Sequence, residues 1–426
     1  MAERPVLPPH QARPAGAATA LAGLRVIDFS HFVAGPYCTL ILGDFGADVL
    51  KIENPVVGDN IRLHRPPALG GEGAAYLWTN RNKRGLALDV SLPAGRDIAL
   101  ALIDQADVLV ENFSTGVMDR LGLGYAELSA RNPRLIYCSI SAAGRDGAMA
   151  QRMGFDPIAQ AESGFMAING HPDSDGVVAG APIMDITTGM MASNAILAAL
   201  AARERLGQGQ YIEIAMFDQA AQLVSYRAIG YLATGIEPPR VGNMGRANTP
   251  VGVYPTATGP IYLCCANERT YRRLALDVFG RADLADGPEY ANLAARLANF
   301  DGFNDIVRAI LATNTRDHWI DKMRAAGVPV GAVATIAEAF SGADMRERGL
   351  LSEIPHPTAG TVPNVAPPYR LSLTPVVDPV AAPTLGQHTR EVLHSLLKLD
   401  DAALAELALS GALGEPARGA AQAVQT

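Results

Sequence analysis

Cysteine and histidine are too few and too scattered to build a metal site or a disulfide framework. Only four cysteines occur in 426 residues, and none is spaced as C-x-x-C or combined with histidine in a zinc-binding pattern. The adjacent Cys264 and Cys265 are expected to point to opposite faces of a strand, because side chains alternate along a strand. We therefore expect no metal site, and a reducing compartment, the cytoplasm, as the location of the protein.

Charge is also scarce, and it is not concentrated anywhere along the chain. Charged residues make up 18% of the sequence, the net charge is −8, and there is no run rich in lysine and arginine. Binding to nucleic acid or to an anionic membrane surface requires a basic patch of that kind. Neither partner is therefore expected.

Long hydrophobic segments are missing as well. Residues 1–21 are rich in proline and alanine, lack the apolar run of a signal peptide, and are expected to form a mobile N-terminal tail. The most apolar stretch, near residues 190–202, is interrupted by Ser193 and Asn194. We therefore expect no membrane-spanning segment.

A phosphate-binding loop is absent after the first predicted strand. Residues 30–43 contain neither G-x-G-x-x-G nor G-x-x-x-x-G-K-[ST], which removes the main sequence support for NAD or ATP. A dehydrogenase would have to bind NAD without its fingerprint.

The sequence does contain an alternation of strand and helix patterns. A β-branched run at 24–29 precedes a helix predicted from Pro36 to Gly46 and a strand at 47–53, and the order recurs with strands at 106–113 and 134–141. This alternation predicts an α/β fold with a parallel sheet. Since 426 residues exceed one hydrophobic core and 49% of them are hydrophobic, we expect two domains.

The second domain is indicated by breaks in composition. Pro238, Pro239 and the stretch GNMGRANTP (242–250) interrupt the pattern, and a strand at 261–267 with helices to about residue 325 predicts a smaller α+β unit. A proline-rich segment over 355–384 then reads as an extended return connection.

Asp185 lies in the strongest helix pattern of the chain, which ends at Gly207. One interpretation is an N-cap, for which aspartate is a preferred residue. The other is a nucleophile, because a helix N-terminus lowers the pKa of a carboxylate and keeps it ionised. Gly189 follows one turn later, where glycine is tolerated when a ligand or backbone approaches closely.

Further polar residues have both a structural and a functional interpretation. His31 follows the first strand, where parallel sheets bind ligands at the point of strand-order reversal, but it could simply tie the turn to nearby backbone. Asp156 precedes Pro157 in a turn or capping context, and Arg120 is either a surface arginine or a bidentate phosphate ligand. Lys83 and Arg84 fit a solvated basic turn.

With these residues assembled, the chain resembles the class III CoA-transferase family of the CaiB/BaiF type. This superfamily includes formyl-CoA transferase, carnitine CoA-transferase and α-methylacyl-CoA racemase. The resemblance covers about residues 22–398 and rests on blocks in family order: LAGLRVIDFSHFVAGP, LGDFGADVLKIENPVVGD, NRNKRGLALDV, ADVLVENFSTGVMDRLGLGY, GFDPIAQAESGFMAI, PIMDITTGMMA, AAGVPVGAV and LGQHTREVL.

The resemblance implies an interlocked homodimer whose subunits thread through each other. It implies a large Rossmann-like, CoA-binding domain over residues 22–225 that is completed by residues 371–412. A linker with the glycine-rich loop (226–245), a small domain (246–340), a return linker (341–370) and a C-terminal tail (413–426) complete the chain.

The resemblance also implies site residues. Asp185 matches the family nucleophile, with Gly189 as the glycine of its D-x-x-x-G block. His31, Ala34, Asp156 and Gly189 are expected to support the reacting centre and its oxyanion. Contacts to CoA are expected from His31, Val33, Ala34, Leu88, Asn112, Phe113, Arg120 and Leu121.

Two departures from the family pattern bear on the reaction. Val33 stands where formyl-CoA transferase has glutamine, which argues against formate and oxalate chemistry. Phe155 stands where the racemase branch has its histidine, and phenylalanine cannot abstract an α-proton. We therefore favour CoA transfer, with racemisation or non-catalytic acyl-CoA binding as the alternatives.

The expected substrates are CoA thioesters, with no permanently bound cofactor, and a small carboxylic acid as acceptor. Succinyl-CoA is a possible donor, because Arg246 and Asn248 could hold the second carboxylate of a dicarboxylate acceptor. Asp185 would form an acyl anhydride and then an aspartyl-CoA thioester, with oxyanion donors near Ala34 and in the loop at 242–246.

Overall fold

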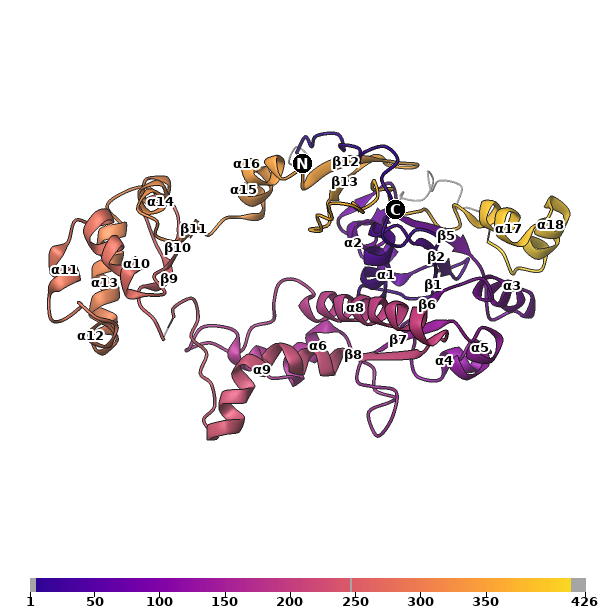
Figure 1. Cartoon of the computed structure of the whole chain (residues 1–426), viewed down its shortest axis with the longest axis horizontal. Coiled ribbons are helices and arrows are strands. Elements are labelled where there is room, and N and C mark those ends of the chain that lie inside the picture. Colours follow the sequence, from indigo (N-terminus) through magenta and orange to yellow (C-terminus); the bar gives the residue numbers. More distant parts are fainter. Residues whose placement is uncertain (1–4, 246, 415–426) are drawn as a thin grey trace, which may run out of the picture. The chain divides into compact units, whose positions relative to one another are not determined.

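The computed structural model describes residues 5–245 and 247–414. The chain divides into two compact units (Figure 1). The larger unit comprises residues 5–165, 179–226 and 343–414, and the smaller one comprises residues 166–178 and 227–342.

A six-stranded sheet forms the centre of the large unit, in the order β5-β2-β1-β6-β7-β8. All neighbouring strands are parallel, which confirms the predicted parallel α/β arrangement. The strands are β1 (Arg25–Asp28), β2 (Asp48–Glu53), β5 (Lys83–Ala87), β6 (Val108–Glu111), β7 (Ile136–Ser141) and β8 (Tyr211–Ala215).

Helices cover both faces of this sheet and bury two separate hydrophobic clusters against it. One face packs against α3 (Pro93–Ile103), α5 (Tyr125–Arg131), α17 (Thr389–Leu397) and α18 (Asp401–Leu409). The other face packs against α1 (Ala34–Asp44), α6 (Asp156–Glu162), α8 (Ile183–Leu206) and α9 (Met216–Thr234). The helices α17 and α18, from the far end of the chain, thus complete the core of the large unit.

The strand order reverses between β1 and β6. From β1 the chain builds outward through β2 to β5, and it then returns to the other side of β1 with β6, β7 and β8. Ligands of open α/β sheets bind at the carboxyl ends of the strands that flank such a switch point. Here those ends lead into His31 after β1 and Asn112 after β6.

The basic pair Lys83 and Arg84 does not form the solvated turn that its charge suggested. Both residues begin β5, and the Lys83 ammonium is fully buried with the Asp28 carboxylate 3.0 Å away. Asp28 lies 55 positions away in the sequence, and this distant partner compensates the desolvation of the lysine.

The remaining elements of the large unit are short. In the N-terminal segment, Glu353 N donates to Pro8 O and Arg13 N donates to Asp378 Oδ1, and the mobile tail stays a prediction. The hairpin of β12 (Leu351–His356) and β13 (Gly360–Val365) occupies part of the expected return linker. The other short elements of the large unit are η1 (Asn60–Leu63), β3 (Ala68–Leu69), β4 (Glu72–Gly73), α2 (Ala74–Thr79), α4 (Val117–Arg120) and α16 (Ala343–Glu347).

Helix α8 begins earlier and is longer than the sequence pattern indicated. By length and composition alone it is apolar enough to cross a membrane, although core helices of globular domains pass the same test. In the structure α8 runs beside α1 and packs on the sheet (Figure 1). Near its end, Arg203 is buried and forms an ion pair with Asp107.

The small unit has a three-stranded antiparallel sheet in the order β11-β10-β9, made by β9 (Val251–Tyr254), β10 (Ile261–Cys264) and β11 (Val330–Ala332). Five of its helices bury one compact core, consistent with the predicted α+β unit: α10 (Glu268–Arg273), the π-helix η2 (Leu274–Val278), α11 (Ala282–Asp286), α13 (Phe300–Leu311) and α14 (Arg316–Ala325). The unit also contains α12 (Leu293–Ala298) and α15 (Ile336–Ser341). In the sequence, the short α7 (Phe165–Ile168) begins with the last residue of the first segment of the large unit, and its other residues belong to the small unit.

Candidate active site

The turn after β1 is clamped to the end of β6. His31 N donates to Asn112 Oδ1 at 2.8 Å, and Asn112 Nδ2 donates back to His31 O at the same distance. The His31 ring also lies against the Phe113 ring, with centroids 5.3 Å apart. The structure therefore brings together His31, Asn112 and Phe113, three of the residues that the family resemblance assigns to CoA, at the switch point of the sheet.

The start of α1 offers hydrogen-bond donors to a ligand. Within the described ranges, no acceptor is found for the backbone N–H groups of Val33, Ala34 and Gly35. The first N–H groups of a helix have no partner inside the helix and carry the positive end of its dipole. They are suited to stabilise negative charge, as an oxyanion requires.

Helix α8 approaches α1 closely at Gly189. A Cβ atom on Gly189 would lie 2.5 Å from Ala34 O and 3.2 Å from Cys38 N. This contact explains the glycine predicted to serve a close approach.

The direction of the two helices places Asp185 toward the start of α1. Helix α1 follows β1 and α8 precedes β8, so both run from the carboxyl edge to the amino edge of a parallel sheet. Asp185 lies one turn before Gly189 on the same helix face. Asp185 therefore lies one helical turn beyond the contact of Gly189 with Ala34, on the side of the turn that precedes α1.

Asp185 is not the N-cap that its sequence context suggested. Helix α8 begins at Ile183, Pro182 occupies the capping position without a side-chain bond, and Asp185 is the third helical residue. Its half-buried carboxylate has no hydrogen bond or ion pair within residues 5–245 and 247–414. A carboxylate without a partner is available for chemistry.

The pKa of Asp185 also departs from the sequence argument. Burial raises it, and the nearby Asp156 charge raises it further, to about 7. The helix dipole, which was expected to lower this pKa, is outweighed, because the side chain is withdrawn from water and faces a like charge.

Asp156 performs the capping that was considered for Asp185. Its Oδ2 atom accepts hydrogen bonds from Met184 N at 2.6 Å and Asp185 N at 3.1 Å, so it satisfies N–H groups at the start of α8. Its Oδ1 atom accepts from Gln160 Nε2, and Gln160 Oε1 in turn accepts from Ala179 N. Asp156 is buried and both of its carboxylate oxygens accept hydrogen bonds, whereas the Asp185 carboxylate accepts none from the described residues.

Gln160 was missed from sequence, although its i+4 spacing from Asp156 on α6 could have indicated the contact. It orients the Asp156 carboxylate from one side, while the backbone of α8 holds it from the other.

The remaining residues assigned to CoA differ in how accessible they are. Arg120, at the end of α4, is exposed, and the described part of the chain contains no ion pair for it. Leu121 and Val33 are half-buried. Leu88 is buried in the core at 2% exposure, so only its backbone is available for contact.

The residues proposed for the acceptor acid, Arg246 and Asn248, stay a prediction. Arg246 lies outside the described residues, and Asn248 is a half-buried residue of the small unit. The expected oxyanion donors of the glycine-rich loop are engaged locally: Gly242 N, Met244 N and Gly245 N donate to Gly170 O, Val241 O and Val251 O.

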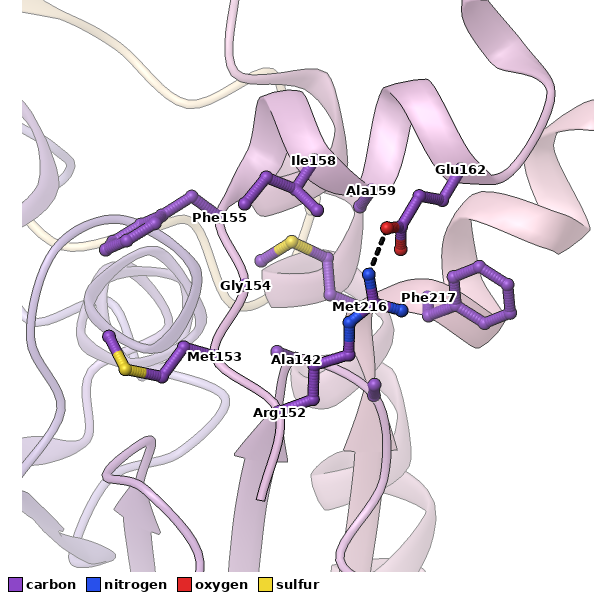
Figure 2. A pocket seen from close by; sticks show the side chains of 11 residues that line it. Ala142, Arg152, Met153, Gly154, Phe155, Ile158, Ala159, Glu162, Met216 and Phe217 are labelled. Carbon is purple, nitrogen blue, oxygen red and sulfur yellow. Dashed lines mark hydrogen bonds and ion pairs between the residues drawn. The ribbon is translucent and has the colours of Figure 1, made fainter. Parts of the chain in front are cut away.

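A narrow cavity adjoins Asp156 between α6, α9 and the loop before α6 (Figure 2). Its walls are mainly apolar, and an ion pair between Arg152 and Glu162 crosses one side. Figure 2 shows Phe155 extending away from the α9 side, and its ring stacks edge-on against Phe32 at 5.6 Å. The residue before Asp156 is thus an aromatic side chain that lines the cavity and cannot act as a titratable base.

Comparisons with known proteins agree over nearly the whole chain. The family model described as CoA-transferase family III matches residues 21–389. Succinyl-CoA:glutarate CoA-transferase of Mus musculus is 33% identical, covering 92% of this chain and 90% of its own. Succinate–glutarate CoA-transferase of Agrobacterium fabrum is 37% identical, covering 88% and 95%. The crystal structure of a CaiB/BaiF family protein from Brucella suis superimposes with a TM-score of 0.81 at 33% identity, covering 89% of this chain and all of the other.

Proposed function

The chain belongs to CoA-transferase family III, and we propose that it moves CoA from an acyl-CoA donor to a carboxylic acid with Asp185 as covalent nucleophile. The observation that supports this assignment is the Asp185 carboxylate, which has no hydrogen-bond or ion-pair partner among the described residues. It lies one helical turn before Gly189, which approaches Ala34 at the start of α1, where the N–H groups are free.

The reaction balances without an external cofactor. An oxygen of ionised Asp185 attacks the donor thioester carbonyl, and the CoA thiolate leaves, which gives an acyl-aspartyl anhydride. The thiolate then attacks the Asp185 carbonyl, releases the donor acid and forms an aspartyl-CoA thioester. The acceptor carboxylate repeats these two steps in reverse order and regenerates the Asp185 carboxylate. Exchange between two carboxylic acids needs neither ATP hydrolysis nor a metal.

Each tetrahedral state carries a negative oxygen, and we propose that the N–H groups of Val33, Ala34 and Gly35, which have no acceptor within the described ranges, stabilise it. Loss of one such donor typically lowers a rate by about 100- to 1,000-fold. Arg120, exposed and without an ion pair in the described ranges, is proposed to hold a CoA phosphate.

We propose succinyl-CoA as donor and a small dicarboxylic acid such as glutarate as acceptor. Support comes from the relatives, which are named for succinyl-CoA and glutarate. Asn248 and Arg246 remain the proposed contacts of the second carboxylate. To test this, the purified chain is incubated with succinyl-CoA and a panel of carboxylic acids, and CoA products are identified by mass spectrometry. Glutaryl-CoA is expected, and a panel without any new thioester would contradict the proposal.

The rate should depend on pH through the ionisation of Asp185. Because its pKa is raised to about 7, the carboxylate form, and therefore activity, is lost as the pH falls through this value. The rate at pH 6 is expected to be about tenfold below the plateau above pH 8.

The raised pKa has a second cause that a variant can remove. Asp156→Asn takes away the like charge and is expected to move the midpoint of the pH–rate profile to lower pH, while burial keeps it above the usual aspartate range. A midpoint that does not move would show that Asp156 does not face the nucleophile.

We further propose that the chain forms a homodimer, as the resemblance implies. Support comes from α9 and the segment that follows it, where Ile229, Leu232 and Ile236 are at least 65% exposed. Light scattering of the purified protein tests the dimer. The cytoplasmic location expected from cysteine usage stays a prediction.

A further inference from the structure

The turn that precedes α1 is conformationally strained. Phe32 has a φ of +63°, in the left-handed region that side chains other than glycine rarely adopt. Such a residue persists only where its surroundings hold it, and strain of this kind is concentrated at functional sites. Phe32 immediately precedes the N–H groups of Val33, Ala34 and Gly35.

A buried ion pair holds this turn. Lys51 and Asp59 are fully buried and lie 3.0 Å apart, Nζ to Oδ2. Asp59 Oδ1 accepts from Phe32 N at 3.0 Å, and Lys51 Nζ donates to Ser30 O at 2.7 Å. The pair therefore clamps the backbone on both sides of His31.

The remaining polar groups of the turn are also fixed by side chains. Asn112 binds the N–H and the carbonyl of His31, and Asp28 accepts from Ser30 N. The first backbone donors left free are those at the start of α1. The backbone groups held by side chains thus end at Phe32, and the proposed oxyanion donors begin at the next residue, Val33.

Asp59 also faces the His31 ring, with Oδ1 3.8 Å from Nδ1. An acidic neighbour on this side favours the tautomer with a proton on Nδ1 and leaves Nε2 unprotonated. The other charged groups around His31 are Lys51, Glu53 and Asp28.

We propose that Lys51 and Asp59 are positioning residues for CoA transfer, on the premise that the chain transfers CoA as proposed above. They keep Phe32 in its left-handed conformation and thereby aim the N–H groups of α1 at the oxyanion. In this role they act through the turn and not by contact with the substrate. Asp59 Oδ1 also accepts from Ile61 N at 3.1 Å and so caps η1, which joins η1 to the turn.

The proposal predicts a selective loss of turnover in Asp59→Asn. The neutral amide is a weaker acceptor for Phe32 N, and it cannot present oxygen to both Phe32 N and Lys51. A misplacement of catalytic groups by 1 Å typically costs about 100-fold in rate, so kcat is expected to fall by about that factor, while KM for the acyl-CoA changes by less than about threefold.

Two alternative second substitutions at Phe32 distinguish a loss of its positive-φ conformation from a general loss of structure. Phe32→Gly and Phe32→Ala both remove the ring, but only glycine adopts positive φ without strain. In the Asp59→Asn background, Phe32→Gly should recover at least about tenfold in kcat relative to Phe32→Ala. Equal kcat for the two double variants would overturn the proposal. The same comparison in a Lys51→Met background applies if Asp59→Asn does not fold.

A structural readout distinguishes failure of this proposal from failure of the proposed function. A crystal structure of Asp59→Asn is expected to show Phe32 relaxed to negative φ. A Phe32 that keeps its positive φ would show that Asp59 does not hold this conformation and would contradict the proposal, whether or not the protein transfers CoA. Conversely, if the wild-type chain transfers no CoA while Phe32 relaxes in the variant, the proposed function is refuted, but the conclusion that Asp59 holds Phe32 in its conformation is retained.

Discussion

Asp185→Asn is expected to lower CoA transfer by on the order of 10⁴-fold or more, because an amide cannot form the acyl anhydride. The substitution is nearly isosteric and Asp185 makes no side-chain bond to another described residue, so the fold should be preserved. Initial rates with succinyl-CoA and glutarate, compared with the wild type, check this result. Residual transfer within about tenfold of the wild type would show that another group is the nucleophile.

The same variant is expected to be more stable than the wild type above pH 7. The folded pKa of Asp185 is raised to about 7 from 3.8, so the stability that this group contributes is present below pH 3.8 and lost as the pH rises toward 7. The full shift corresponds to about 4 kcal/mol, and for a half-buried side chain we expect about 1–2 kcal/mol.

Urea unfolding at pH 8 and at pH 4 measures this difference in stability. The gain of Asp185→Asn should be present at pH 8 and nearly absent at pH 4. A variant that is less stable than the wild type at pH 8 would indicate that the carboxylate has a structural partner, and the assignment as a free nucleophile would be wrong.

Gly189→Ala should separate the two helices that form the site. Alanine normally stabilises a helix interior by about 1 kcal/mol relative to glycine. Here its Cβ would lie 2.5 Å from the backbone oxygen of Ala34, which cannot move as a flexible side chain can. The clash is expected to dominate, lowering stability by about 1–2 kcal/mol and transfer by about 100-fold as Asp185 moves away from the start of α1.

A matched control is available in the small unit. Gly302 is an exposed residue in the first turn of α13, and a Cβ placed there would meet no atom within 4 Å. Gly302→Ala should leave transfer unchanged and should not lower stability. If Gly189→Ala matched this control in thermal unfolding and rate, the close contact between α1 and α8 would not matter for function.

The order of strands and helices could be predicted because each predicted strand of the sheet is a run of apolar residues, which can be seen in the sequence without knowing its distant partners. β1, β2, β6 and β7 all lie where the β-branched or apolar segments were seen. β5 was missed, since its buried Lys83 depends on Asp28, and a pairing across 55 positions leaves no local pattern.

The sequence predicts Asp185 as the nucleophile, which stays a prediction, and the environment of this carboxylate could not be predicted. The helix that carries Asp185 starts three residues earlier than the pattern suggested, which moves Asp185 inside the first turn. Its raised pKa depends on Asp156, which α6 supplies from 29 positions away. Burial and the charge of Asp156 therefore raise the pKa of Asp185, whereas the helix dipole alone predicted a lowered pKa.

Trapping the covalent intermediate tests the central claim most directly. Wild-type protein is mixed with succinyl-CoA, treated with hydroxylamine or borohydride, digested and analysed by mass spectrometry. A mass change is predicted on the peptide that contains Asp185, absent from Asp185→Asn. A label on the peptide containing Asp156, or none while CoA transfer proceeds, would contradict the account.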